Sequence, residues 1–240
     1  MKTLRFLSVV LTVCLLATGM TSCELLDILG AATAPSDTTE QTDTTPTCDM
    51  AEVKAEIDSM EVSDFTETSE ITEYVKITVR DHGEMIIRLR SDVAPISVRN
   101  FQKLVGEGFY NGLTFHRIKK NFVIQGGDPL GNGTGGSKAV IKGEFELNGV
   151  RNDLSHITGV ISMARLVKPY DSATSQFFIC NADASALLDG AYAAFGYVVA
   201  GLDVLMSVSN VELEVDSSGR EVSSPVEPVV MEKICFVTKN

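Results

Sequence analysis

The sequence predicts a mainly β protein whose main domain spans residues 74–240 and forms a closed or nearly closed barrel. Three features predict this fold class. Apolar and polar residues alternate with a period of two across a glycine-containing turn at residues 74–89, which is typical of a β-hairpin. The later apolar runs are short, as strands are, and only two segments have the spacing of amphipathic helices. Many short strands with so few helices are typical of antiparallel barrels rather than of parallel α/β sheets.

The elements of the domain are expected in the following order. Residues 75–79 and 85–89 are the two strands of the hairpin. A helix is expected to begin at Pro95, because proline is favoured in the first helical turn, and to end at Gly106 and Gly108. Further strands are expected at residues 122–124, 159–163, 176–180, 194–199 and 229–237, with a second helix at 202–208.

The N-terminus has the pattern of a bacterial lipoprotein signal peptide. Two basic residues precede an apolar stretch at residues 6–17, which is too short to cross a membrane but has the length of a secretory signal. Residues 20–23 resemble the box in which a cysteine is lipidated, so we expect residues 1–22 to be removed and Cys23 to carry the anchor. The alternative is an ordinary cleaved signal with an accidental cysteine. In the lipid-anchored form the protein would be tethered to the bacterial cell envelope, in the periplasm or at the outer membrane.

Residues 23–73 form an acidic, threonine-rich arm with 14 acidic residues and one basic residue. We interpret it as a solvated, self-repelling tether, and a partner-binding segment is the alternative. The spacing of Met50, Val53, Ile57 and Met60 predicts a short amphipathic helix within the arm. The net charge of the whole chain is −12, which argues against nucleic acid as a partner.

Two patterns that carry chemistry in other proteins are given a structural interpretation. The run at residues 131–136 matches a G-x-G-x-x-G phosphate loop, but residues 139–144 have strand and turn character, so no helix N-terminus is available for phosphate. We expect a surface loop with positive φ angles. The cysteines and histidines lack the spacing of metal sites, so we expect no metal, and we expect Cys180 and Cys235 to be small buried apolar side chains.

Five segments of the domain carry the strongest signal for function. They are FHRI at 115–118, NFVIQGGD at 121–128, GVISMAR at 159–165, SQFFI at 175–179 and LDGAYAAFG at 188–196. In this order and spacing they closely resemble the cyclophilin family of peptidyl-prolyl cis/trans isomerases. The resemblance covers residues 75–238, and the three motifs FHR, QGGD and SQFF together are far more specific than any single glycine pattern.

The resemblance implies a closed eight-stranded antiparallel β-barrel capped by two α-helices, with an active groove on its outer face. It implies that Arg117 is the catalytic arginine. The residues that it implies for substrate binding are Phe122, Val123, Phe178, Leu188 and Tyr192 in a proline pocket, Gln125 and Gln176 on the substrate backbone, and Ala164 with Arg165 in the segment that pairs with the peptide.

Three positions depart from the pattern of the best-studied members. Val123 stands where methionine is common, and Tyr192 stands where histidine is common. Leu187 stands where many members have tryptophan, which argues against tight binding of cyclosporin. None of these departures removes the catalytic arginine.

The implied activity is rotation about X-Pro peptide bonds. Its barrier is about 18–20 kcal/mol, because the delocalised lone pair of the prolyl nitrogen must be localised midway. A guanidinium beside that nitrogen favours the twisted state and no covalent bond changes, so we expect no cofactor. We expect proline-containing segments of unfolded or exported proteins as partners, and a lipid-anchored monomer. The alternative is a non-catalytic peptide-binding chaperone on the same fold.

Overall fold

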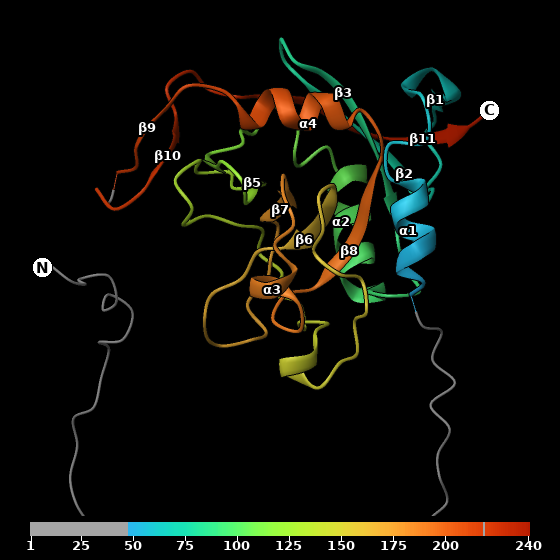
Figure 1. Ribbon diagram of the computed structural model, residues 1–240, viewed down its shortest axis with the longest axis horizontal. Helices are drawn as coiled ribbons and strands as arrows, with labels where there is room; N and C mark the ends of the chain where they lie inside the picture. The colour runs from blue at the N-terminus through green and yellow to red at the C-terminus, as the bar shows by residue number, and fades with distance from the viewer. Residues whose placement is uncertain (1–47, 218) are drawn as a thin grey trace, which may run out of the picture. The chain divides into compact units, whose positions relative to one another are not determined.

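The structure is a computed structural model that describes residues 48–217 and 219–240. Its main feature is a nine-stranded antiparallel sheet (Figure 1). A separate two-stranded sheet joins β9 (Leu213–Val215) to β10 (Val222–Pro225). In the order of pairing, the strands of the large sheet are β1 (Phe65–Glu67), β11 (Met231–Lys239), β2 (Tyr74–Val79), β3 (Gly83–Leu89), β8 (Ala194–Ala200), β6 (Val160–Met163), β7 (Phe177–Cys180), β5 (Val123–Gly126) and β4 (Arg117–Lys119). The mainly β class is confirmed.

The large sheet differs from the closed eight-stranded barrel that the resemblance implied. Among the described residues its two edges are β1 and β4. The physical reason is that the free edge of β11 is shared. β1 pairs with residues 237–239, whereas residues 112–115 bond to residues 229–231 through hydrogen bonds and an isolated bridge. Through the second contact, residues 112–115, which precede β4, lie beside the start of β11. The sheet therefore nearly closes, but β4 and β11 are not joined by a continuous ladder of hydrogen bonds.

Four α-helices accompany the sheet in the described parts of the chain. Helices α2 (Pro95–Gly106) and α4 (Leu202–Ser209) confirm the two helices expected in the domain, and α1 (Met50–Glu56) confirms the short helix expected in the arm. The fourth, α3 (Ser185–Leu188), is a single turn and offers too few residues for a periodic pattern. Figure 1 shows α4 along the top of the sheet and α1 beside β8. The remaining helical turns are the 3₁₀ turns η1 (Val62–Asp64) and η2 (Glu146–Asn148).

The core lies on the inner face of the sheet. Successive residues of a strand point to opposite faces, and one residue in two along β4 to β7 is fully buried in the main apolar cluster. These inward residues include Ile118, Ile124, Ile161 and Ile179. Phe101 of α2 packs into the same core with ring centroids 5.1–5.5 Å from three other aromatic rings. The residues between the inward ones therefore face outward, where the candidate site lies.

Residues 48–73 pack on the outside of the sheet instead of extending away from it. Val53 of α1 is fully buried in a second apolar cluster with residues of β3, β6 and β8. Glu56 accepts two hydrogen bonds from the guanidinium of Arg88, at 2.7 and 2.8 Å, and one from the hydroxyl of Tyr197. The predicted domain boundary at residue 74 is the first residue of β2, but described residues before it, such as Val53 and Glu56, already pack on the sheet.

Glu144 is a buried carboxylate that caps α2 from a distant part of the chain. The helix has alanine at its N-cap position and no capping side chain of its own. Instead, Glu144 accepts hydrogen bonds from the backbone N–H groups of Ile96 and Ser97, at 2.9 and 2.8 Å, and from the hydroxyl of Ser97 at 2.7 Å. We expect Glu144→Ala to lower the free energy of unfolding by about 2–3 kcal/mol, because buried donors lose a charged acceptor. Urea denaturation measures this, with Glu146→Ala, an exposed neighbour, as the control. Equal stabilities for the two variants would disprove the capping role.

Several predictions for the N-terminal part of the chain fall on residues 1–47. The signal peptide, Cys23 and the first half of the tether therefore lie outside the described residues. In the described remainder, no helix is long and apolar enough to cross a membrane, and no group of three or more His, Cys, Asp or Glu side chains is placed to hold a metal ion. Cys180 is buried as expected, and burial raises its pKa to about 12, which makes it an unreactive thiol. Cys235 is partly exposed, contrary to the expectation.

Candidate active site

Four adjacent strands place one row of outward-facing side chains across the sheet. Arg117 on β4 lies opposite Gln125 on β5, Gln125 lies opposite Phe178 on β7, and Phe178 lies opposite Ser162 on β6. Directly opposite residues on antiparallel strands have Cβ atoms about 4.5–5.5 Å apart. The row therefore brings the expected catalytic arginine within two strand spacings of Phe178, although the two are far apart in the sequence.

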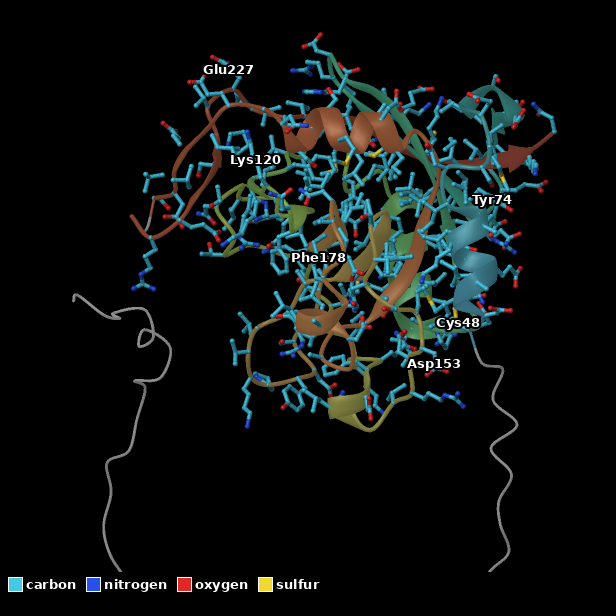
Figure 2. All side chains as sticks on the ribbon, in the orientation of Figure 1. Cys48, Tyr74, Lys120, Asp153, Phe178 and Glu227 are labelled. Carbon is cyan, nitrogen blue, oxygen red and sulfur yellow. The ribbon has the colours of Figure 1, made fainter. Side chains whose placement is uncertain are left out.

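The residues expected to form the proline pocket belong to one apolar cluster on this outer face. Phe178 is 5% exposed and meets Tyr192 edge to face, with ring centroids 5.6 Å apart. Figure 2 labels Phe178 near β7 and above α3, the helix that supplies Leu188. Sequence reasoning missed Cys180 and Ala184, because a small apolar side chain gives no signal of the face on which it lies. The cluster consists of Phe122, Val123, Ala164, Phe178, Cys180, Ala184, Leu188 and Tyr192.

The polar residues expected at the site form a continuous chain of hydrogen bonds. Arg117 donates from Nη1 to Oε1 of Gln125 at 3.3 Å, and Gln125 donates from Nε2 to Oε1 of Gln176 at 2.9 Å. Gln176 in turn donates to the carbonyl oxygens of Gly133 and Gly135, at 3.1 and 2.7 Å. The two glutamines are thus held in place by their neighbours before any peptide binds.

The glycine-rich loop at residues 131–136 binds a carboxylate of the protein itself. Gly131 and Gly133 have positive φ angles of 65° and 86°, as expected for a surface loop. The side chain of Asp128 accepts hydrogen bonds from the backbone N–H groups of Leu130, Asn132 and Gly133, at 2.6–3.1 Å. Asp128 therefore occupies the donors that a phosphate would need, and the loop serves as the outer wall that holds Gln176.

Arg165 and Ala164 are at the site, but the side chain of Arg165 is engaged within the protein. Its guanidinium donates to the carbonyl oxygen of Ala191 at 2.7 and 2.9 Å, and lies 4.6 Å from the ring centroid of Tyr192. The backbone N–H of Ala164 donates to the carbonyl oxygen of Gln176 at 3.0 Å. Peptide pairing at Ala164 would therefore use its carbonyl group, and Arg165 acts on the pocket by holding the Tyr192 ring.

A cavity of about 660 Å³ adjoins the apolar cluster. Its walls include four of the expected substrate-binding residues, and Ala164 belongs both to these walls and to the apolar cluster, so the two surfaces are continuous. The rest of the lining comes from the glycine-rich loop, from Ser137 and Val140 after it, and from residues 166–174. The four shared residues are Gln125, Ala164, Arg165 and Gln176.

Glu221 is a further charged residue at the site that sequence reasoning did not identify. It accepts hydrogen bonds from Nε of Arg117 at 2.8 Å and from Nη2 at 3.2 Å, and its Oε1 lies 2.5 Å from Nζ of Lys119. The hydrogen bond from Arg117 lowers the pKa of Glu221 to about 2, against the opposing effect of burial and with the help of Lys119. No motif surrounds Glu221, and its partners lie about a hundred residues earlier in the chain, so only the fold reveals the contact.

The lowered pKa of Glu221 predicts how pH acts on this contact. A carboxylate whose pKa is lowered from 4.5 to about 2 on folding contributes stability that is complete above about pH 4.5 and is lost as the pH falls toward 2. We expect the stability difference between the wild-type chain and Glu221→Gln to be constant at neutral pH and to shrink below about pH 4.5. Urea denaturation at a series of pH values measures it. A difference independent of pH would contradict the ion pair.

A buried network supports Phe178 on the outer face of the sheet. The ring of His156 stacks on Phe178 with centroids 6.0 Å apart, and its nitrogens bond to Asp189 at 2.8 Å and to the hydroxyl of Ser162 at 3.0 Å. The set Ser162, His156 and Asp189 has the order of a hydrolase triad. However, Ser162 is 0% exposed and His156 is 1% exposed, so no substrate reaches the hydroxyl. The network instead fixes the floor of the apolar cluster.

The structure brings together on the outer face the residues that the sequence resemblance implied for the isomerase groove. The profile of the family described as "Cyclophilin type peptidyl-prolyl cis-trans isomerase/CLD" matches residues 74–235. The chain belongs to the cyclophilin family. The match begins at the first residue of β2 and includes every residue expected at the site.

Relatives named as peptidyl-prolyl cis-trans isomerases and a solved structure support the same assignment. The chain is 42% identical over 132 residues to peptidyl-prolyl cis-trans isomerase B of Bacillus subtilis, which covers 55% of this chain and 87% of that protein. It is 41% identical over 152 residues to a peptidyl-prolyl cis-trans isomerase of Acinetobacter baylyi, covering 61% and 77%. A crystal structure of a cyclophilin-type isomerase of Cryptosporidium parvum, obtained in the presence of the dipeptide Ala-Pro, matches with a TM-score of 0.60 and 28% identity, covering 68% of this chain and 98% of that one.

The family and its named members confirm the enzyme class that the sequence predicts, peptidyl-prolyl cis-trans isomerase (EC 5.2.1.8). They also confirm the cyclophilin fold in its mainly β form.

Proposed function

We propose that this cyclophilin isomerises X-Pro bonds with Arg117 as its catalytic residue. The observation that carries the proposal is the row in which Arg117, Gln125 and Phe178 face outward from adjacent strands. This row puts a permanent cation two strand spacings from Phe178, which belongs to the apolar cluster on the outer face. A prolyl ring on that cluster and the guanidinium would then meet at the prolyl nitrogen.

One well-placed hydrogen-bond donor and an apolar pocket together account for the transition-state stabilisation that catalysis requires. A 10⁴-fold acceleration needs about 5.4 kcal/mol of transition-state stabilisation. One preorganised donor supplies roughly 3–4 kcal/mol when it acts on charge or a lone pair that exists only in the transition state. The remainder comes from holding the ring against Phe178, Phe122 and Leu188 while the preceding peptide group rotates.

The polar chain would hold the peptide beside the reacting bond. Gln125 and Gln176 line the adjoining cavity and are fixed by hydrogen bonds to each other and to the glycine-rich loop. Peptide groups on one side of the proline can exchange hydrogen bonds with these amides. The dipeptide Ala-Pro in the Cryptosporidium crystals supports a proline-containing ligand for this fold.

We also propose a cellular setting, which rests on the sequence pattern of residues 1–47. A lipid on Cys23 and a tether of acidic and threonine residues would hold the monomeric enzyme at the bacterial cell envelope. Its substrates there would be proline-containing segments of exported proteins. Radiolabelled palmitate in the mature protein, absent from Cys23→Ser, tests the anchor. Equal labelling of both forms would rule it out.

The experiment that tests the activity uses the full chain and a short peptide with an Ala-Pro bond. Exchange spectroscopy by NMR measures the rate of cis/trans interconversion directly. The proposal expects catalysis by the wild-type chain and little by Arg117→Ala. A non-catalytic chaperone would instead leave the exchange rate at its uncatalysed value while both chains suppress aggregation of an unfolded protein to the same extent.

A further inference from the structure

Glu221 occupies a defined position at the loop end of the hairpin formed by β9 and β10, immediately before β10. Its carbonyl oxygen accepts a hydrogen bond from the N–H of Asp216 at 2.8 Å, and its own N–H points to Oδ1 of Asp216 at 3.4 Å. Figure 1 shows this hairpin at the end of the molecule away from β1. The backbone of Glu221 is therefore fixed by the hairpin before its side chain reaches β4.

The hydrogen bonds from Arg117 to Glu221 fix the orientation of the guanidinium plane. The carboxylate takes hydrogen bonds from Nε and Nη2, and Gln125 takes one from Nη1 on the opposite side. A guanidinium has five N–H donors, and these contacts engage three of them. The plane of the group is thus set by two partners from different parts of the chain, and two further N–H groups remain to act on a substrate.

The charge balance keeps Arg117 an effective donor in spite of its carboxylate partner. Lys119 also binds Glu221, so the cluster contains two cations and one anion. The side chain of Arg117 is 31% exposed and that of Glu221 is 22% exposed, so the pair is partly shielded from water without being cut off from the groove. The net charge of the cluster is positive, and a localised lone pair at the prolyl nitrogen would still be attracted to it.

We propose that Glu221 is a positioning residue that holds the Arg117 guanidinium in the orientation needed at the prolyl nitrogen. This inference rests on the proposed function of Arg117. An arginine side chain has about 2 kcal/mol of rotamer entropy, and a side chain that is already ordered does not lose that entropy at the transition state. The hairpin β9–β10 is accordingly part of the machinery of the enzyme, although it contributes no atom to the pocket.

The test compares Glu221→Ala and Glu221→Gln with Glu227→Gln, an exposed glutamate close in the sequence. In the full chain, kcat and KM for an Ala-Pro peptide are measured separately by NMR exchange, and the ¹⁵N resonance of Arg117 Nε is recorded. A loss of the correct orientation of the Arg117 guanidinium lowers kcat, whereas a general loss of structure also changes KM. We expect kcat to fall about tenfold in Glu221→Ala and less in Glu221→Gln, which retains one hydrogen-bond acceptor, with KM changed less than about twofold. Glu227→Gln should match the wild type.

The Nε resonance separates this inference from the proposed function. In Glu221→Ala it should move or broaden, whether or not turnover is measured. An unchanged resonance, or a kcat equal to that of the wild type, overturns the positioning role. A raised kcat overturns it as well, because it would mean that Glu221 withholds Arg117 from the substrate. If the wild type and Arg117→Ala were equally inactive, the proposed function would fail, and the Nε resonance would still decide whether Glu221 orders the guanidinium.

Discussion

Arg117→Ala is expected to lower kcat/KM for an Ala-Pro peptide about 100- to 1,000-fold. Removal of one preorganised donor at a reacting centre costs about 2.7–4 kcal/mol, because the stabilisation exists only in the transition state. The pocket formed around Phe178 stays in place, so the loss should be mostly in kcat. NMR exchange spectroscopy or a coupled peptide assay measures it.

Two control variants make this result specific. Arg99→Ala removes an exposed arginine of α2 and should leave kcat/KM unchanged. Arg117→Lys keeps the positive charge but lacks the planar group that bonds Glu221 and Gln125 together, so it should recover only a small part of the activity. Activity of Arg117→Ala within about threefold of the wild type would disprove the catalytic role of the guanidinium.

Phe178→Ala is expected to raise KM about tenfold or more and to lower the free energy of unfolding by about 3 kcal/mol. The ring is nearly buried between Tyr192 and His156, so its removal leaves a cavity in the floor of the pocket. An apolar contact of this size is worth about 1.5–3 kcal/mol to a bound ring. Peptide titration followed by NMR gives the affinity, and urea denaturation gives the stability.

Phe65→Ala is the matched control, because Phe65 packs against Tyr74 at the opposite edge of the same sheet, with ring centroids 5.1 Å apart. It should lower stability and leave KM unchanged. Phe178→Leu should have a smaller effect on KM than Phe178→Ala, because it keeps most of the apolar volume. Equal changes of KM in Phe65→Ala and Phe178→Ala would show that Phe178→Ala raises KM only by destabilising the protein.

Local sequence patterns predicted the helices and strands whose buried residues recur at a regular spacing. The hairpin of β2 and β3 and helix α2 have a period of two or 3.6 that follows their burial against the core, and each lies close to its expected residues. Strand β7 also lies close to its expected residues, although all four of its residues are buried. Six of the eight residues of the apolar cluster were expected at the site from the family motifs, and the structure brings them together. Periodicity alone could not have separated Phe178 from Phe177, because both are buried, one on each face of β7.

Long-range contacts that involve few residues escaped prediction. Strand β1 has three residues and pairs with residues 237–239, and it forms one edge of the large sheet. Glu221 and Glu144 act through partners in distant segments, and neither has a motif around it. Such contacts depend on the register of the whole sheet, which a local pattern does not contain.

The most direct test of the account is a crystal structure of the chain with a bound peptide that contains Ala-Pro. The account predicts the prolyl ring against Phe178, Phe122 and Leu188, with a guanidinium nitrogen of Arg117 within hydrogen-bond distance of the prolyl nitrogen or its carbonyl group. A ring bound elsewhere, for example in the cavity between Thr134 and Thr174, with no guanidinium nitrogen of Arg117 within reach of the peptide, would contradict it.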